Sequence, residues 1–329
     1  MPRGILWAVD FGQERVTALV VEPKSGSFRL LGSAQVPSAG MKYGEIENLG
    51  DVTESLVAVL RQAGKSSSLK CSAVFYNFDD AQLESRTPSG SRSLSGEGQI
   101  LRADIDQAVL SAMRLVGHFE KSAVYSRPMH FLIDGKDSVV NPVGVFGRQL
   151  DVRMHVLLAR AQNLENWKKV IRRAGLNKGT GVLSVLSSVY GCLDREERRG
   201  KRLVFDLGRD ILNAVYFENG AISRYAGAAR SEKTETADWV RAVCDSFKPG
   251  EGDVILTGDL AAENENLGRV CPPSEPGLPL FGRPEHSSAV GLLRLAFETS
   301  GRSASVSEAP HQWVHGLKQK ASVFIQEYF

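Results

Sequence analysis

A strand–turn–strand unit that occurs twice constrains the fold of this chain more than any other feature. The first copy covers residues 5–21 and turns at Asp10-Phe11-Gly12. The second copy covers residues 202–217 and turns at Asp206-Leu207-Gly208. Each turn follows an apolar strand and precedes another strand. Two matched copies predict an α/β chain built as two similar halves around one cleft.

The Asp-x-Gly turns are typical of hairpins that hold a phosphate. Glycine lacks a Cβ, so a phosphate can approach the backbone and accept hydrogen bonds from the turn amides. A carboxylate at each strand end can hold a metal ion through water. A further strand over residues 254–256 is followed by Thr257-Gly258. The alternative is two unrelated β-turns.

The segments between the two copies predict alternating helices and strands. A segment over 85–98 is poor in large apolar residues and predicts a mobile loop or a weak hairpin. Residues 298–310 are rich in Ser, Glu, Gly, Ala and Pro and predict a disordered tether. The expected helices are 51–62, 104–116, 163–174, 181–193 and 288–297, and the other expected strands are 28–36, 72–78, 129–134, 150–158 and 221–225.

The last eighteen residues predict an amphipathic helix. At about 100° per residue, six of them share one apolar face, while two lysines lie near its edges. Such a helix binds a membrane interface, and the alternative is a last helix that packs on its own domain. The membrane-binding candidates are Trp313, Val314, Leu317, Lys318, Lys320, Phe324, Ile325, Tyr328 and Phe329.

Composition excludes several classes of function. With 40 Lys and Arg against 38 Asp and Glu, the net charge of +2 gives no drive towards nucleic acid. The four cysteines and six histidines lack metal-ligand spacing, so we expect reduced cytoplasmic thiols and no metal site. We find no pattern of a catalytic triad or a signal peptide. We find no apolar run near the roughly 20 residues that a membrane span needs.

Other segments match one protein family in the family's own order. They are residues 37–48, 141–144, 147–150, 173–176, 187–190, 194–200 and 288–293. With the two turns and the tail, they resemble the FtsA family of bacterial cell-division proteins, within the actin-like ATPase superfamily. The resemblance covers nearly the whole chain.

The resemblance implies a two-lobed actin-like (ribonuclease-H-like) α/β fold with an inserted 1C (SHS2) subdomain and a C-terminal amphipathic helix. It also implies protein contacts at Asn141, Pro142, Val143 and Gly144 in 1C. The expected divisions are 1–82 with 156–199 for lobe 1A, 83–155 for 1C, 200–297 for a reduced lobe 2A, 298–311 for a flexible linker and 312–329 for the membrane helix.

The resemblance also implies a role. Members of this family link filaments of the tubulin-like FtsZ to the inner membrane, recruit later division proteins and self-associate into actin-like filaments. We therefore expect a cytoplasmic adaptor that lies on the inner face of the membrane at the division site. The family's nucleotide would be ATP with magnesium. The corresponding residues here are Asp10, Gly12, Gln13, Asp206, Gly208, Arg209, Thr257 and Gly258.

The chain departs from the family pattern at those positions. Gln13 and Glu14 replace a small hydroxyl residue, and Arg209-Asp210-Ile211 replaces a glycine-rich turn. The larger residues block backbone approach to phosphate, and the added carboxylates repel it. Arg209 can offset part of that repulsion by pairing with phosphate. Thr257-Gly258-Asp259 replaces Thr-Gly-Gly.

The interval between Asp206 and Thr257 is about 50 residues and leaves no room for most of subdomain 2B. We therefore predict weak or absent ATP binding and no catalytic residues. Two other hypotheses share this fold. One is a PilM-like cytoplasmic scaffold of a type IV pilus or secretion platform. The other is a true ATPase or kinase.

Overall fold

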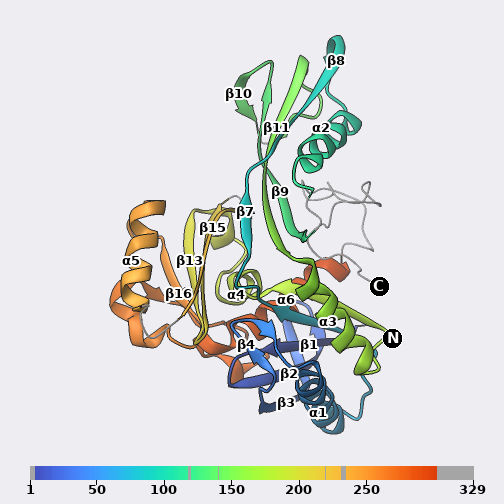
Figure 1. Cartoon of the computed structure of the whole chain (residues 1–329), viewed down its shortest axis with the longest axis vertical. Helices are drawn as coiled ribbons and strands as arrows, with labels where there is room; N and C mark the ends of the chain where they lie inside the picture. Colours follow the sequence, from blue (N-terminus) through green and yellow to red (C-terminus); the bar gives the residue numbers. More distant parts are fainter. Residues whose placement is uncertain (1–3, 118–119, 140, 219, 231–234, 302–329) are drawn as a thin grey trace.

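The computed structural model describes residues 4–117, 120–139, 141–218, 220–230 and 235–301. In this part of the chain, strands form three five-stranded sheets and one small two-stranded sheet. Two of the large sheets belong to two lobes that lie side by side, and the third forms a subdomain that extends away from them (Figure 1). Residues 302–329, with most of the predicted tether and all of the predicted amphipathic helix, lie outside the described residues.

The sheet of the first lobe has the strand order β12-β6-β1-β2-β3. β1 pairs with β2 in antiparallel fashion and with β6 in parallel. Its strands are β1 (Leu6–Phe11), β2 (Arg15–Lys24), β3 (Ser27–Pro37), β6 (Ala73–Phe78) and β12 (Lys178–Leu183). Its helices are α1 (Leu49–Ser67), α3 (Ala161–Arg173) and α6 (Ser287–Gly301).

Alternation along β1 separates the two faces of this sheet. Phe11 points to one face, where its ring lies 4.8 Å from that of Trp167 on α3. Asp10 points to the opposite face, towards α6. Helices therefore cover both faces of β1, with α3 on the side of Phe11 and α6 on the side of Asp10.

The second lobe repeats the first. β13 pairs with β14 in antiparallel fashion and with β16 in parallel, as β1 does with β2 and β6. The duplication predicted from the sequence is therefore confirmed. Its strands are β13 (Arg202–Leu207), β14 (Ile211–Glu218), β15 (Ala221–Ala229), β16 (Val254–Thr257) and β17 (Arg269–Val270), and its helices include α4 (Ser184–Cys192) and α5 (Thr236–Phe247).

Helices α4 and α6 join the lobes by direct backbone contact. A Cβ on Gly291 of α6 would lie 1.6 Å from the carbonyl oxygen of Ser187, and one on Gly191 of α4 would lie 1.9 Å from that of Ser287. No side chain larger than hydrogen fits at either position. Four short 3₁₀ helices complete the lobes at Glu197–Arg199, Ala262–Leu267, Pro279–Phe281 and Pro284–His286.

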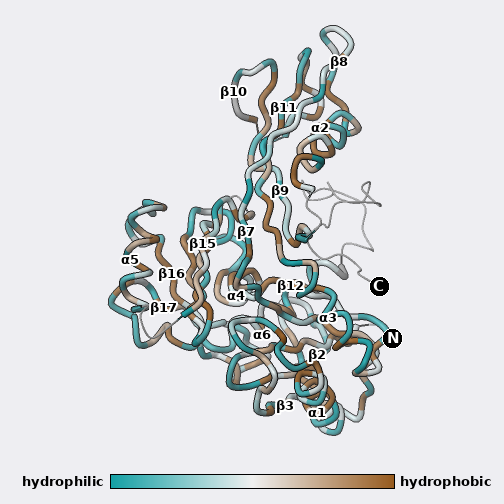
Figure 2. Tube along the Cα trace, in the orientation of Figure 1, coloured by the Kyte–Doolittle hydropathy of each residue, from teal (hydrophilic) through white to brown (hydrophobic). Residues whose placement is uncertain are grey.

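The third sheet forms the inserted subdomain, residues 84–160. β9 and β11 are its long central strands, and α2 packs on one face over a separate apolar core. Figure 2 shows apolar residues along β9 and a pale to hydrophilic β8. Its elements are β7 (Glu84–Arg86), β8 (Ser89–Gln99), α2 (Arg102–Arg114), β9 (Lys121–Ile133), β10 (Lys136–Val139) and β11 (Phe146–Arg160).

Two of the expected elements are wrong. The segment 85–98 is neither a loop nor a hairpin, because β7 and β8 each pair with β11. Gly90 lets α2 approach, since a Cβ there would lie 2.3 Å from the carbonyl oxygen of Ala108. The expected helix over 181–193 begins only at Ser184, because residues before it pair with β6 as strand β12. In both places partner strands override a weak local pattern.

Candidate functional site

A cleft of about 100 Å³ lies between the two lobes. Of the eight predicted nucleotide-site residues, seven line it, namely Asp10, Gly12, Gln13, Asp206, Gly208, Arg209 and Gly258. The structure thus brings together residues that are about 250 positions apart in the sequence. Thr257 is fully buried instead. Its hydroxyl group lies 2.6 Å from that of Ser287 and donates to the carbonyl oxygen of Pro284 at 3.1 Å.

Asp10 is held by a buried asparagine on the neighbouring strand. The side-chain amide of Asn77 donates to Oδ1 of Asp10 at 2.5 Å, and its own oxygen accepts from the backbone N–H of Phe11 at 2.6 Å. The same amide nitrogen lies 3.2 Å from the hydroxyl of Ser184 and 3.1 Å from that of Ser288. Asn77 therefore connects β1 and β6 to both helices that join the lobes.

Asp206 has a similar place in the second lobe. The hydroxyl group of Ser188 on α4 donates to its Oδ2 at 2.9 Å. Gly258, with φ +90°, approaches so closely that a Cβ would lie 2.7 Å from Oδ1 of Asp206. The glycine is thus required by both backbone conformation and space.

A third carboxylate, Asp79, bridges the lobes from the end of β6. Its Oδ1 accepts a hydrogen bond of 3.1 Å from the side-chain amide of Asn213 on β14. The oxygen of that amide accepts in turn from the hydroxyl group of Tyr225 at 2.8 Å. This chain of contacts crosses from the first lobe to the second.

The clustering of these carboxyl groups disfavours their charged forms. Burial raises the pKa of Asp10 to about 7 and that of Asp206 to about 7, and like charges nearby add to the shift. Burial also raises the pKa of Asp79 to about 6 and raises the pKa of Asp259. Desolvation is the largest cause in each case. The carboxyl groups of Asp10 and Asp206 therefore take up protons near neutral pH.

The two predicted phosphate turns contact each other directly. Nε of Arg209 lies 2.9 Å from Oε1 of Glu14, so the arginine of the second turn is paired with the first. The backbone of each turn is closed on itself, because the N–H of Gly12 donates to Arg15 and the N–H of Gly208 donates to Ile211. The guanidinium group of Arg209 and the N–H groups of Gly12 and Gly208 thus already have partners within the protein, at the place where a phosphate would bind.

A small hairpin covers the same region. It consists of β4 (Met41–Lys42) and β5 (Glu45–Ile46), joined by a turn at Tyr43 and Gly44. Met41, Lys42 and Gly44 line the cleft. A Cβ on Gly44 would lie 2.5 Å from Cδ1 of Ile211 in the other lobe. The hairpin therefore reaches across the cleft.

These features do not fit a magnesium-bound triphosphate. Ligand pockets of drug-sized molecules have volumes of about 300–1,000 Å³, whereas this cleft has about 100 Å³. Its lining includes Asp10, Asp79, Asp206 and Asp259, whose charged forms would repel phosphate. Among the described residues, no group of three or more His, Cys, Asp or Glu side chains has an arrangement that could hold a metal ion.

The described residues of the interval expected to lack subdomain 2B form elements of the second lobe. Between Asp206 and Thr257, these residues comprise the end of β13, all of β14, β15 and α5, and strand β16. α5 packs on the second sheet, where Trp239 lies edge-on to Phe205 at 5.7 Å. It therefore belongs to the core of this lobe and forms no separate wall beside the cleft.

The remaining predicted residues lie elsewhere. Asn141, Pro142, Val143 and Gly144 form a turn of the inserted subdomain in which Oδ1 of Asn141 accepts from the N–H of Val143 at 3.2 Å. Asn141 and Val143 are exposed, and Pro142 is buried. All nine membrane-binding candidates, from Trp313 to Phe329, lie outside the described residues. None of the described helices combines the length and apolarity needed to cross a bilayer.

Sequence reasoning missed Asn77, Asp79, Asn213 and Ser288 as parts of the site. A signal existed for two of them. Asn77 is a polar residue inside an apolar strand, and Asp79 follows that strand at its carboxyl end, where ligands of α/β sheets bind. The serine on α6 could not be placed without knowing that α6 crosses to the cleft.

Comparison with known proteins identifies the inserted subdomain. A family described as the SHS2 domain inserted in FtsA matches residues 81–158. The chain is 23% identical to the cell division protein FtsA of Neisseria meningitidis serogroup B, over 80% of this chain and 63% of that protein. It is 24% identical to FtsA of Escherichia coli K12, over 67% of this chain and 52% of that protein. The chain thus spans about half to two thirds of the length of these relatives.

The fold is also similar to that of a solved protein. A chain of the PilM–PilN type IV pilus biogenesis complex superposes with a TM-score of 0.55 at 16% sequence identity. The match covers 89% of this chain and 99% of the other. The two-lobed α/β architecture with an inserted subdomain is therefore an actin-like fold.

Proposed function

We propose that this chain, whose inserted subdomain matches the SHS2 domain of FtsA and which is similar to FtsA proteins, is an adaptor in bacterial cell division. The observation that carries the proposal is the match of its inserted subdomain to the SHS2 domain of FtsA, within a chain similar to FtsA over most of its length. In this proposal, it links filaments of an FtsZ-type protein and later division proteins to the inner membrane at the division site.

The proposed membrane contact is the amphipathic helix that the sequence predicts over residues 312–329. Its apolar face would lie in the headgroup region, and affinity would rise with the apolar area that is buried. The protein would be cytoplasmic and peripheral. The proposed protein contacts include the turn at Asn141–Gly144, and self-association into actin-like filaments is part of the same proposal.

Vesicle flotation tests the membrane contact. We expect the full chain to float with vesicles of phosphatidylglycerol and phosphatidylethanolamine, and a chain that ends at Pro310 to remain at the bottom. Trp313→Glu on the apolar face should abolish flotation. Ser322→Glu adds the same charge on the polar face and should retain most of it. Equal flotation of the full and shortened chains would contradict the proposal.

We further propose that the cleft binds ATP weakly or not at all and that the protein is not an enzyme. The contact between Glu14 and Arg209, the small volume and the buried carboxyl groups support this. Calorimetry with magnesium and ATP should show binding no tighter than about 1 mM, or about −4 kcal/mol. Binding at about 1 μM, with steady phosphate release, would favour the ATPase hypothesis instead.

The alternative is a PilM-like scaffold of a type IV pilus or secretion platform. What favours it is the similarity of fold, because a chain of the PilM–PilN complex superposes over 89% of this chain and 99% of its own length with a TM-score of 0.55. Co-sedimentation with FtsZ polymers would support the division role. Capture of a short cytoplasmic peptide from a pilus membrane protein by the inserted subdomain, without FtsZ binding, would support the alternative.

A further inference from the structure

The hairpin formed by β4 and β5 is anchored in the second lobe at its tip. Its two turn residues, Tyr43 and Gly44, have φ values of +49° and +70°, as in the tight turns that join two-residue hairpins. The N–H of Tyr43 donates to Oδ2 of Asp210 at 3.1 Å. Gly44 packs against Ile211 and Asp79 so closely that a Cβ would lie within 2.6 Å of both side chains.

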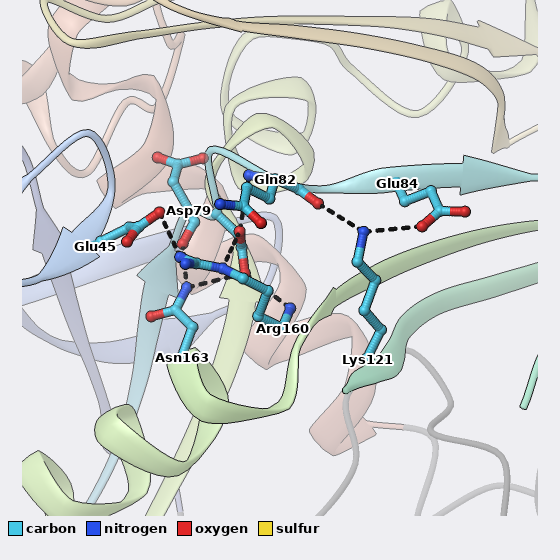
Figure 3. A network of polar contacts seen from close by, with 8 residues as sticks. Glu45, Asp79, Gln82, Glu84, Lys121, Arg160 and Asn163 are labelled. Carbon is cyan, nitrogen blue, oxygen red and sulfur yellow. Dashed lines mark hydrogen bonds and ion pairs between the residues drawn. The ribbon is translucent and has the colours of Figure 1, made fainter. Parts of the chain in front are cut away.

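The base of the hairpin is anchored in a different way. Glu45, in β5, forms an ion pair with the guanidinium group of Arg160 (Figure 3). Arg160 also donates twice to Asp80, from Nε to Oδ1 at 3.2 Å and from its backbone N–H to Oδ2 at 2.9 Å. The carboxyl group of Asp80 is fully buried, and Asn163 donates to its Oδ2 at 3.3 Å. Arg160 is thus bonded to a buried carboxylate, so that a movement of Arg160 is passed on to Asp80.

Arg160 lies where the inserted subdomain joins the first lobe. It is the last residue of β11 and pairs in register with Lys121, the first residue of β9. Lys121 donates to Glu84 at 2.8 Å and to the carbonyl oxygen of Gln82 at 3.4 Å (Figure 3). It thus ties the start of β9 to the segment that leads from the first lobe into β7. We call these residues, 80–84 with Lys121 and Arg160, the root of the subdomain.

The root is also one residue away from the cleft. Asp80 holds Arg160, while its neighbour Asp79 lines the cleft and accepts from Asn213 in the second lobe. Asn163 donates both to Asp80 and to the carbonyl oxygen of Asp79 at 2.9 Å. A movement of the root therefore acts on the cleft along two routes, one through Asp79 and one through Glu45.

We propose that the β4–β5 hairpin is a strap across the mouth of the cleft and that Arg160 couples it to the inserted subdomain. When a partner tilts the subdomain, Arg160 moves with β11 and takes Glu45 with it. The tip then loses its contacts with Asp210 and Ile211, and the cleft opens. Opening of the cleft acts on the subdomain by the same free energy, because coupling between two sites is reciprocal.

The polar contacts that hold the strap are at least partly exposed to solvent and therefore weak enough to break and form again. The side chains of Glu45 and Arg160 are 33% and 26% exposed, so solvent screens their attraction in part. The hydrogen bond from Tyr43 to Asp210 is exposed. Each contact can break without unfolding the lobe that carries it.

Hydrogen exchange of the full chain tests the strap. We expect Glu45→Gln to raise the exchange rate of amides in residues 41–46 and 209–211 about threefold to tenfold, with unchanged global stability. Arg160→Met should do the same, although its effect includes the loss of a partner for buried Asp80. Glu22→Gln removes a comparable pair with Lys24 and Arg29 in the same lobe and should leave both segments unchanged.

The coupling itself is tested by a double substitution. Lys121→Met loosens the root without contacting the hairpin, and it should raise exchange in residues 41–46 of the parent chain. In the Glu45→Gln background it should add little, because the route to the hairpin is already cut. No effect of Lys121→Met in the parent, or the same factor in both backgrounds, would overturn the proposal.

Discussion

The hydroxyl group of Tyr125 lies 2.6 Å from the backbone nitrogen of Ile222 and accepts its N–H. Tyr125 belongs to β9 of the inserted subdomain, and Ile222 belongs to β15 of the second lobe. The subdomain is inserted in the first lobe, but it is therefore also bonded to the second. His155 on β11 lies beside the same tyrosine ring at 6.0 Å and keeps this junction packed.

Replacement of this tyrosine tests the strength of the junction. We expect Tyr125→Phe to reduce the free energy of unfolding by about 1–3 kcal/mol, because it leaves the buried N–H of Ile222 without an acceptor. Tyr216→Phe, in which the ring of Tyr216 contacts Arg224 at 4.9 Å, serves as the control and should cost less. Urea denaturation would measure both. Equal effects would mean that the hydrogen bond contributes nothing specific.

The contact between α4 and α6 should tolerate no added carbon. Gly291→Ala would place a Cβ 1.6 Å from the carbonyl oxygen of Ser187, so the helices must separate. We expect a loss of at least about 3 kcal/mol, at the upper end of the range for overpacked cores. Gly98→Ala adds the same group where nothing lies within 4 Å and should change stability little. Thermal denaturation distinguishes the two variants.

Gly44 and Gly26 form a matched pair for testing the hairpin. Both have positive φ, of +70° and +77°, so alanine costs similar backbone strain at each. Only at Gly44 would the new Cβ meet other atoms, those of Ile211 and Asp79. We therefore expect Gly44→Ala to destabilise the protein by about 1–3 kcal/mol more than Gly26→Ala. Similar values in urea denaturation would contradict the observed packing of the hairpin.

The carboxyl cluster makes stability depend on pH. The folded pKa values of about 7, 7 and 6 for Asp10, Asp206 and Asp79 exceed the usual value of 3.8. The folded state therefore binds more protons between about pH 4 and 7. The stabilisation is complete below pH 4 and is lost as the pH rises through 6 and 7. We expect the contribution of these groups to lower the melting temperature between about pH 4 and 7 and to change it little above pH 7.

Asp10→Asn should reduce that slope, since it removes one titrating group and preserves the shape of the side chain. Asp134→Asn is the control. Backbone N–H groups of Arg148 and Gln149 lower the pKa of Asp134, so its titration lies below this pH range. An unchanged slope in Asp10→Asn would mean that Asp10 remains charged in the folded protein.

Much of the fold was accessible from the sequence because its signals are local. The two strand–turn–strand units, the helix that ends before Gly175 and the carboxylates at the ends of β1 and β13 follow from periodicity and turn residues. β8 and β12 were missed for the opposite reason. Their residues become strands only because β11 and β6 lie beside them.

The chemistry of the site was less accessible than its location. The sequence placed Arg209 and Glu14 in the two turns, but only the structure shows that they pair with each other. Asn77 and Ser288 meet although 211 positions separate them, and no local pattern carries such a contact. The hydroxyl of Thr257 was expected in the cleft and is instead directed at Ser287.

The length of β11 gives the inserted subdomain mechanical leverage. The strand has 15 residues and runs from Phe146 in the subdomain to Arg160 at its root. At about 3.3 Å per residue, it forms an arm of roughly 50 Å. A pivot of about 10° at Arg160 would sweep the far end of such an arm through roughly 9 Å. A partner that pulls there with modest force therefore delivers a large torque to a few hydrogen bonds.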